Sequence, residues 1–350
     1  IKLSQMRWAY HGVPAASNLL PGSQLRRSVA PVAPSPPVRP ITDQARLYHS
    51  CYVAPCLNDM HAVPRLMLGL PASVSRRGMS ASAQAATVDP TATGPELGVV
   101  EQFDVLGAIP NHLERTAVVS GGKSFKYRDV LAAAAQLAVQ ISDGVDLTGE
   151  RVALLAPPGV EFVAGTWASW LCNTISVPLA LSHPSSELQY VIQDSGASVV
   201  IAHPEYVEKL APIAKECGAR LIILGVGCSP ASDSDADSAA AAAKAAAASI
   251  SMEDGCLIIY TSGTTGRPKG VLHTHRSISS QIASLSAAWQ WQANDHILHC
   301  LPLHHIHGLV NALHSAHVNG AAVEFQTFAP ARIWKAIKGD TTVFMGVPTM

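Results

Sequence analysis

The stretch LIIYTSGTTGRPKG, residues 257–270, joins an apolar segment to a loop rich in hydroxyl groups and glycine. Its first four residues predict a strand buried on both faces, as strands of parallel sheets are. In the loop, hydroxyls supply donors, glycines let backbone N–H groups approach an anion, and a lysine adds a mobile positive charge. The stretch therefore predicts a polyphosphate-binding loop made of Thr261, Ser262, Gly263, Thr264, Thr265, Gly266, Arg267, Pro268 and Lys269.

This loop differs from the Walker A loop, because residues 263–269 read GTTGRPK and the pattern G-x-x-x-x-G-K-[ST] does not occur in the sequence. Pro268 also argues against a helix that continues through the lysine. A surface loop without function is the alternative interpretation. Such a loop would not need this set of residues directly after a buried strand, so we favour phosphate binding.

Composition narrows the class of protein. A chain of 350 residues with 48% hydrophobic residues predicts two or three domains with an ample core. The formal net charge of -1 gives no indication of a nucleic-acid partner. Seven cysteines without a C-x-x-C pair indicate a reducing compartment. Residues 162–181 lack charge, but polar residues and a proline interrupt them, so we expect a buried helix and strand there and no transmembrane segment.

Residues 1–95 differ in composition from the rest of the chain. They are rich in Arg, Ser, Ala and Pro, and residues 1–88 hold nine basic and two acidic side chains. This pattern is typical of an organelle transit peptide, mitochondrial or plastid, with a plain disordered tail as the alternative. The first residue is Ile1, so part of this segment is also consistent with translated leader sequence, in which case a cytoplasmic location stays open.

From residue 96 to 350 the sequence alternates between strand and helix patterns. We predict an α/β domain built from right-handed βαβ units, with mostly parallel sheets covered by helices. The strands are expected at residues 117–125 (a hairpin), 151–155, 175–179, 198–202, 220–224, 257–260, 297–302, 321–325 and 342–345, and the helices at 100–109, 127–142, 160–171, 185–194, 205–217, 277–289 and 330–338. Residues 228–249, rich in Ala, Ser and Asp, predict a solvated low-complexity insert, because a uniform alanine run selects no packing face.

Histidines gather between residues 296 and 317, which hold seven of the fifteen: His296, His299, His304, His305, His307, His314 and His317. No cysteine spacing or neighbouring carboxylate accompanies them, and His296 and His299 would face opposite sides of a strand, so we expect no metal site. Four of the seven, namely His296, His299, His314 and His317, are expected to be ordinary surface or core residues. The segment LPLHHIHG, residues 301–308, is the centre of the cluster.

The motifs resemble those of a known superfamily. TSGTTGRPKG, residues 261–270, is similar at all ten positions to the phosphate-binding signature of the adenylate-forming enzymes, and LPLHHIHG resembles the segment that lines their acyl pocket. With residues 167–179 and 183–202, these motifs are most similar to the malonate-activating branch of the acyl-CoA synthetases. The resemblance covers about residues 97–350 and implies the large N-terminal domain of such an enzyme. It also implies that this domain is incomplete, with the small C-terminal domain and its main catalytic lysine expected beyond Met350.

The resemblance further implies an activity. Malonate would attack Mg²⁺-bound ATP to give an acyl-adenylate, and the thiol of coenzyme A would then displace AMP to give malonyl-CoA. Lys269 would neutralise phosphate charge, His305 would line the junction of the acyl and pantetheine pockets, and His307 would pair with the second carboxylate of malonate. The chain alone is expected to be inactive. Three alternatives remain: a synthetase for another small acid such as methylmalonate, acetate or an aromatic acid, a non-catalytic nucleotide-binding protein, and a P-loop NTPase.

Overall fold

The computed structural model describes residues 7–9, 102, 104–225, 227–261, 266–348 and 350. The strands of this part are β1 (Arg7–Ala9), β2 (Thr116–Ser120), β3 (Lys123–Lys126), β4 (Arg151–Leu155), β5 (Ile175–Pro178), β6 (Val199–Ala202), β7 (Arg220–Ile223), β8 (Gly255–Thr261), β9 (Lys269–Thr274), β10 (His296–His299), β11 (Ala322–Phe325) and β12 (Val343–Met345).

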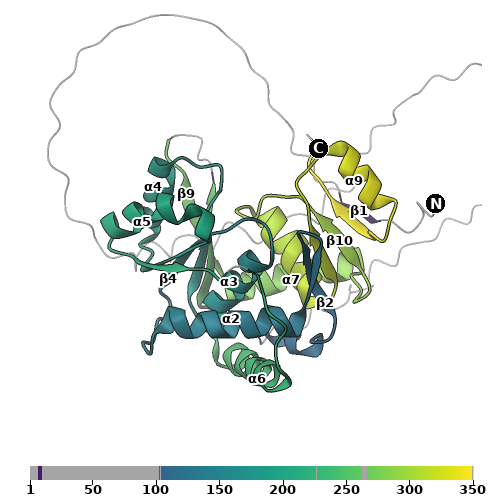
Figure 1. The fold of residues 1–350 in the computed structure, drawn as a ribbon, viewed down its shortest axis with the longest axis horizontal. Helices are drawn as coiled ribbons and strands as arrows, with labels where there is room; N and C mark the ends of the chain where they lie inside the picture. The colour runs from purple at the N-terminus through teal and green to yellow at the C-terminus, as the bar shows by residue number, and fades with distance from the viewer. Residues whose placement is uncertain (1–6, 10–101, 103, 226, 262–265, 349) are drawn as a thin grey trace, which may run out of the picture. The chain divides into compact units, whose positions relative to one another are not determined.

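The helices of the described part follow most of the predicted ranges (Figure 1). They are α1 (Asp104–Ala108), η4 (Ile109–Asn111), α2 (Tyr127–Ser142), α3 (Val160–Leu171), α4 (Ser185–Ser195), η5 (Pro204–Tyr206), α5 (Val207–Glu216), α6 (Asp233–Ser249), α7 (His275–Trp289), η6 (His307–His314), α8 (Ser315–Val318) and α9 (Pro330–Ile337). The helices α6, η6 and α8 had no counterpart among the predicted helices.

One of the two six-stranded sheets has the order β7-β6-β4-β5-β8-β9. Its strands run parallel except at the edge, where β9 pairs antiparallel with β8. The segment after the glycine-rich loop is therefore the edge strand β9, which the sequence analysis missed. It also expected β8 to be buried on both faces, and this is wrong. Leu257 and Ile259 are buried, but Ile258 and Tyr260 are half-buried, because β8 lies one strand from the edge, where cover is incomplete.

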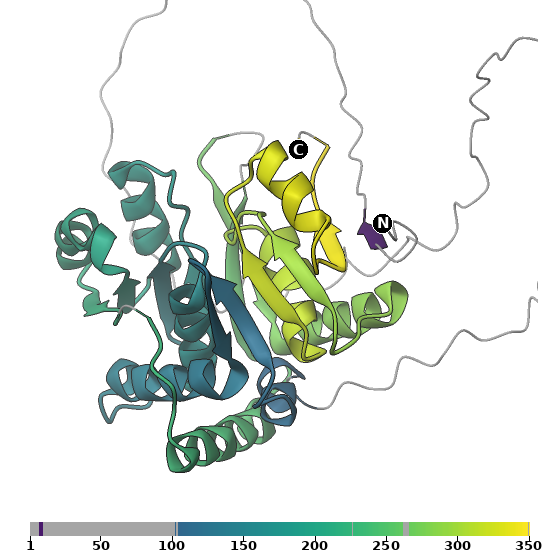
Figure 2. The same ribbon diagram turned by 45° about the vertical axis from the view of Figure 1, so that its right-hand side comes forward.

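The other sheet has the order β1-β12-β10-β11-β2-β3, with a single antiparallel pair, β2–β3, among the described strands. The predicted turn at Gly121 and Gly122 joins that pair, and both glycines have positive φ, as a tight hairpin turn requires. Figure 2 shows β10, β11 and β12 side by side in yellow and green. The prediction of an α/β fold with mostly parallel sheets is confirmed.

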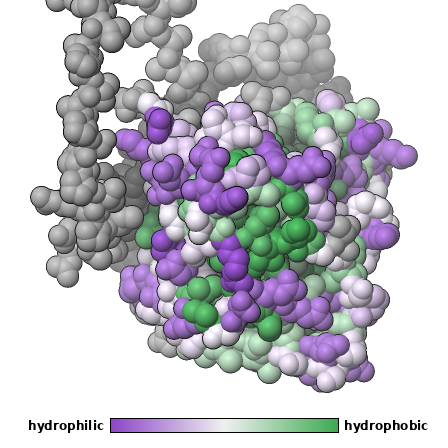
Figure 3. All heavy atoms as spheres, turned by 60° about the vertical axis from the view of Figure 1, so that its left-hand side comes forward, coloured by the Kyte–Doolittle hydropathy of each residue, from purple (hydrophilic) through white to green (hydrophobic). Residues whose placement is uncertain are grey.

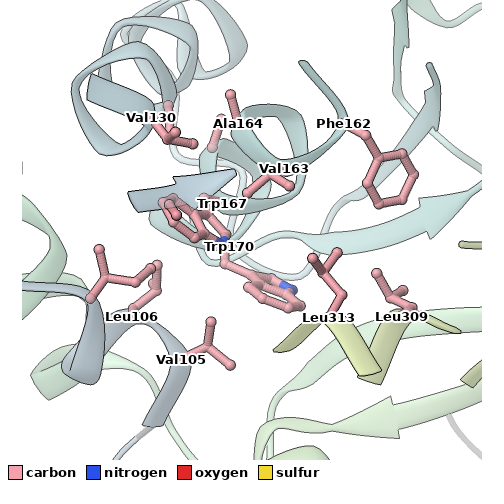
Figure 4. Close-up of a cluster of buried hydrophobic side chains, with 14 of the residues drawn as sticks. Val105, Leu106, Val130, Phe162, Val163, Ala164, Trp167, Trp170, Leu309 and Leu313 are labelled. Carbon is pink, nitrogen blue, oxygen red and sulfur yellow. The ribbon is translucent and has the colours of Figure 1, made fainter. Parts of the chain in front are cut away.

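Helix α3 is buried on nearly every side, since ten of its twelve residues are buried. Its contacts reach β4 and β5 in one sheet and β2 in the other, as well as α1 and α2. Figure 4 shows Trp167 and Trp170 of α3 among apolar side chains of α1 and η6. The indole N–H of Trp170 donates to the carbonyl oxygen of Cys256, 2.9 Å away, so the helix is tied to β8 by a polar contact as well as by packing. The long uncharged stretch is thus explained by this buried helix and strand β5.

Helix α6 corrects the expectation of a solvated linker at residues 228–249. Ser232 caps the helix by accepting a hydrogen bond from the backbone N–H of Asp235. Five alanines on one face are buried: Ala236, Ala239, Ala240, Ala243 and Ala247. The helix lies against α2 and α1 (Figure 1). The alanine run did select a face, because small side chains let two helix backbones approach closely and α2 is itself rich in alanine.

The surface of the described part is mixed in character. Figure 3 shows an apolar patch surrounded by polar side chains on the side where α4 and α5 lie. Exposed apolar side chains also occur on β9, at Val271 and Leu272. Among the described helices, none combines the length and the apolar character needed to cross a membrane.

The predicted leader, residues 1–95, lies outside the described residues except for Arg7–Ala9. These three residues form β1, which pairs parallel with β12. The leader hypothesis therefore remains a prediction.

Candidate functional site

The predicted phosphate loop connects the last residue of β8 to the first residue of β9. Thr261 pairs with Lys269 across the antiparallel ladder, so the loop is the tip of a β-hairpin. Thr261, Gly266, Arg267 and Lys269 are exposed, and Pro268 is half-buried. Ser262, Gly263, Thr264 and Thr265 lie outside the described residues. The prediction that no helix continues through Lys269 is confirmed, since a strand begins there.

Helix α4 supports this hairpin through Tyr190. The Tyr190 hydroxyl donates to the carbonyl oxygen of Pro268 at 2.9 Å, and the guanidinium carbon of Arg267 lies 5.2 Å from the centre of the Tyr190 ring. A cation over an aromatic face is held by the ring quadrupole. The structure therefore fixes the C-terminal half of the loop against α4. Sequence analysis named the segment 183–202 that contains Tyr190 but gave this residue no role in the site.

A second tyrosine connects β8 with the same helix. The Tyr260 hydroxyl donates to Asp194 at 2.8 Å, and its ring meets that of Tyr190 edge to face with 6.4 Å between centres. Burial is the main cause that raises the pKa of the Tyr260 hydroxyl. A side chain at Gly270 would press on the Tyr260 ring, since a Cβ there would lie 3.0 Å from the ring carbon Cζ. Gly270, which ends the motif, therefore lets the backbone of β9 lie close to the ring of Tyr260.

The histidine segment forms a turn that leads into a π-helix. β10 ends at His299, and residues 307–314 form the π-helix η6, a geometry that is rare and is frequently found at functional sites. The His299 ring donates from Nε2 to the carbonyl oxygen of Gly308 at 2.8 Å. A Cβ on Gly308 would overlap the carbonyl oxygen of Pro302. The turn between Pro302 and Gly308 is therefore tightly packed and can hold its side chains in fixed positions.

The histidines divide into two groups. His299, His314 and His317 are buried in the core, as expected, and burial lowers the pKa of each. His317 lies edge-on to Trp167, with 5.2 Å between ring centres. His296 is half-buried and lies 3.1 Å from a carboxylate oxygen of Glu324. The sequence analysis expected no nearby carboxylate, and this is corrected, because the parallel pairing of β10 and β11 brings Glu324 beside His296.

The remaining histidines of the segment lie around the turn. His305 is exposed, while His304 and His307 are half-buried. The His307 Nδ1 accepts from the side-chain amide of Asn311 at 3.4 Å. The His304 ring lies 4.2 Å from that of His305 and 6.0 Å from that of His183, which precedes α4. The structure thus brings the histidine turn and α4 together, and α4 in turn supports the phosphate loop.

Met350 is the last residue of the sequence, and the main catalytic lysine was expected beyond it. Met350 itself is exposed, and its backbone N–H donates to the carbonyl oxygen of Val347 at 2.8 Å. Its Sδ lies 4.0 Å from Sγ of Cys300, which follows β10. Neither the lysine nor the small C-terminal domain falls within residues 1–350, so both remain predictions.

A metal site was not predicted for the histidines. Within the described part of the chain, no group of three or more His, Cys, Asp or Glu side chains has the arrangement needed to hold a metal ion. The described geometry places the β8–β9 hairpin on one side of α4 and the histidine turn near the start of that helix.

The fold and this loop define the class of protein. Residues 108–350 match the model of the family described as AMP-binding enzyme. The chain belongs to this family.

Similarity to individual proteins narrows the class. The malonate–CoA ligase of Arabidopsis thaliana is 36% identical over 267 residues, which cover 69% of this chain and 44% of that protein. The mitochondrial malonate–CoA ligase ACSF3 of Homo sapiens is 38% identical over 247 residues, covering 68% of this chain and 42% of that protein. The ATP-bound structure of MatB from Rhodopseudomonas palustris aligns with a TM-score of 0.61 at 28% identity, covering 71% of this chain and 50% of that one.

The chain spans less than half the length of these curated relatives. Its fold is that of the N-terminal part of the adenylate-forming enzymes, as the resemblance implied.

Proposed function

We propose that this chain is the ATP-binding part of an acid–CoA ligase that activates malonate. In the proposed reaction the malonate carboxylate attacks the α-phosphate of ATP, pyrophosphate leaves, and the coenzyme A thiol then displaces AMP to give malonyl-CoA. ATP, with Mg²⁺ as its counterion, coenzyme A and malonate are the proposed substrates. The observation that carries the proposal is the motif TSGTTGRPKG at the tip of the β8–β9 hairpin, with Lys269 exposed at its exit.

Each part of the loop has a proposed role. Backbone N–H groups and hydroxyls of residues 261–266 bind the β- and γ-phosphates, and Lys269 neutralises charge as pyrophosphate leaves. Tyr190 positions Arg267 and Pro268 and so limits the motion of the loop. His305 and His307 belong to the turn that we propose to line the acid site. His305 is exposed, which suits contact with a substrate.

Malonate as the acid is supported by the similarity to malonate–CoA ligases at 36% and 38% identity. A feruloyl-CoA synthase of Amycolatopsis sp is 29% identical, so an aromatic acid is the alternative substrate. A panel of malonate, methylmalonate, acetate and ferulate separates these possibilities. We also propose a mitochondrial location, supported by the mitochondrial relatives and by the basic character of residues 1–88.

Binding of ATP to the 350-residue chain is the first test. Isothermal titration calorimetry should detect ATP binding to the unaltered chain. Lys269→Ala should weaken the affinity for ATP by about 10- to 100-fold, which is the loss expected when one charge-assisted hydrogen bond is removed. The matched control is Lys338→Ala, which removes an exposed lysine from the end of α9. Equal affinity of the Lys269→Ala variant and the unaltered chain would contradict the proposed role of the loop.

Turnover is the second test. We expect the 350 residues alone to form no malonyl-CoA, because the relatives that carry out the reaction are more than twice as long as the matched region. Malonate-dependent release of AMP from ATP by this chain, followed by chromatography, would contradict that expectation.

A further inference from the structure

A groove of about 660 Å³ lies beside α9 and is separate from the candidate site. Leu298 of β10 packs against Ile333 and Ile337 of α9, so α9 covers one face of this sheet at β10. The groove continues beside the helix, from α9 across His296 and Glu324 to the turn between β2 and β3. None of the described residues of the phosphate loop or of the histidine turn lines it. We call this feature the α9 groove.

The floor of the α9 groove holds a carboxylate in a fixed position. Glu324 lies directly opposite Leu298 in the parallel register of β10 and β11, so its side chain points to the face that α9 covers. One carboxylate oxygen lies 3.1 Å from Nε2 of His296, and the other accepts from the side-chain amide of Gln326 at 2.6 Å. Because each carboxylate oxygen has two lone pairs, Glu324 can still accept a hydrogen bond from a ligand.

Two cations form the wall of the groove on the side of α9. Arg332 and Lys335 both line it and are both exposed. They are three residues apart on the helix, so their side chains are neighbours on its surface. Neither has an ion-pair partner among the described residues. Like charges at this spacing repel each other, and an anion bound between them would remove the repulsion.

The rest of the lining suits a polar molecule. Ser120, Thr327 and Asp340 line the groove in addition to the cations and the floor. Hydroxyl and carboxylate groups such as these form hydrogen bonds with hydroxyls, whereas an apolar ligand would bury them without partners at a cost in free energy. The volume lies in the range of pockets that hold small molecules. The groove is therefore suited to a small ligand that carries both an anionic group and hydroxyl groups.

We propose that the α9 groove binds a phosphate monoester of a polyhydroxy compound, with the phosphate between Arg332 and Lys335 and the hydroxyls on Glu324 and Asp340. Near neutral pH a phosphate monoester carries about 1.5 to 2 negative charges and three acceptor oxygens, enough for both cations. A carboxylate carries a single charge and would neutralise only one of them. This site lies outside the proposed ATP and acid sites, so the inference does not depend on the proposed function.

Titrations of the 350-residue chain test the proposal, with ribose 5-phosphate as the probe and ribose and methyl phosphate as its two halves. Calorimetry should show that ribose 5-phosphate binds more tightly than methyl phosphate and that ribose does not bind. A saturating non-hydrolysable ATP analogue should leave this binding unchanged, because the groove is separate from the phosphate loop. In NMR spectra of ¹³C-labelled histidine, the ring signal of His296, assigned with His296→Gln, should move during the titration, while those of the core residues His314 and His317 should not.

Variants of exposed residues locate the binding. Arg332→Ala and Lys335→Ala should each weaken the affinity for ribose 5-phosphate by about tenfold or more, since each removes a charge-assisted hydrogen bond. The matched control is Lys338→Ala, which removes an exposed lysine from the end of the same helix without touching the groove. Asp340→Ala should weaken ribose 5-phosphate but not methyl phosphate, because it removes an acceptor for a hydroxyl. Far-ultraviolet circular dichroism verifies that each variant is folded.

Four results would overturn the inference. The first is that ribose 5-phosphate does not bind, and the second is that it binds no more tightly than methyl phosphate. The third is an equal loss of affinity in Lys338→Ala and Lys335→Ala, which would mean general attraction to a basic surface. The fourth is displacement of ribose 5-phosphate by the ATP analogue with no effect of Arg332→Ala, which would place the binding at the phosphate loop.

Discussion

The buried histidines make the stability of this chain depend on pH in a calculable way. His299, His314 and His317 are at most 2% exposed, and burial lowers the pKa of each, to about 4 for His299 and about 3 for His317. In the unfolded chain the pKa of histidine is about 6.5. The unfolded state therefore binds protons first as the pH falls. The contribution of these residues to stability is complete above about pH 6.5 and is lost as the pH decreases toward their folded pKa values.

The size of the effect follows from proton linkage. Between pH 7.5 and 5.5 each such histidine lowers the free energy of unfolding by about 1.4 kcal/mol, so the three together lower it by about 4 kcal/mol. Small folded proteins have about 5–15 kcal/mol in total. Acidification to pH 5.5 should therefore remove a large share of the stability.

His317→Phe is the informative perturbation. The phenyl ring keeps the edge contacts with Trp167 and Tyr127, whose ring centres lie 5.2 and 5.7 Å from that of His317, but it cannot be protonated. Urea unfolding followed by tryptophan fluorescence at pH 7.5 and 5.5 gives the free energy of unfolding at each pH. We expect the loss on acidification to be about 1.4 kcal/mol smaller in the variant than in the unaltered chain.

Trp167→Phe serves as the control, because it disturbs the same contacts without removing a titratable group. It should lower the free energy of unfolding by similar amounts at both pH values. If His317→Phe and the unaltered chain lose the same free energy between pH 7.5 and 5.5, then His317 takes up its proton equally in both states, and the reasoning from burial is wrong.

Two further predictions concern packing. Gly308→Ala places a Cβ against the carbonyl oxygen of Pro302 and should lower the free energy of unfolding, measured by urea denaturation, by about 1–3 kcal/mol. The control is Gly225→Ala, where the added Cβ meets open space, and it should change the free energy of unfolding little. Equal effects of the two substitutions would refute the close approach of Gly308 to Pro302. Ala243→Asp puts a charge on the buried face of α6 and should strongly lower the midpoint temperature of thermal unfolding. The control Ala245→Asp, on the exposed face of the same helix, should leave that temperature nearly unchanged. Similar midpoint temperatures for the two variants would support a solvated linker instead of a packed helix.

The sequence by itself determined the alternation of strands and helices, and it predicted the chemistry of the loop. Helix α2 and strand β4 have the predicted bounds, because hydrophobic period and turn residues act locally. The Gly121-Gly122 turn was likewise readable, since only glycine accepts its positive φ values without cost. The motif at residues 261–270 predicted a phosphate loop from residue types alone.

Tertiary structure decided which of these features meet. No local signal shows that β8 lies beside an edge strand or that α6 uses its alanines to approach α2, because both depend on what the rest of the chain offers for packing. Tyr190 and His183 entered the site only through the position of α4. Burial is also a property of the fold, and it separates the core histidines His299, His314 and His317 from the half-buried or exposed histidines of the turn although the residue type is the same.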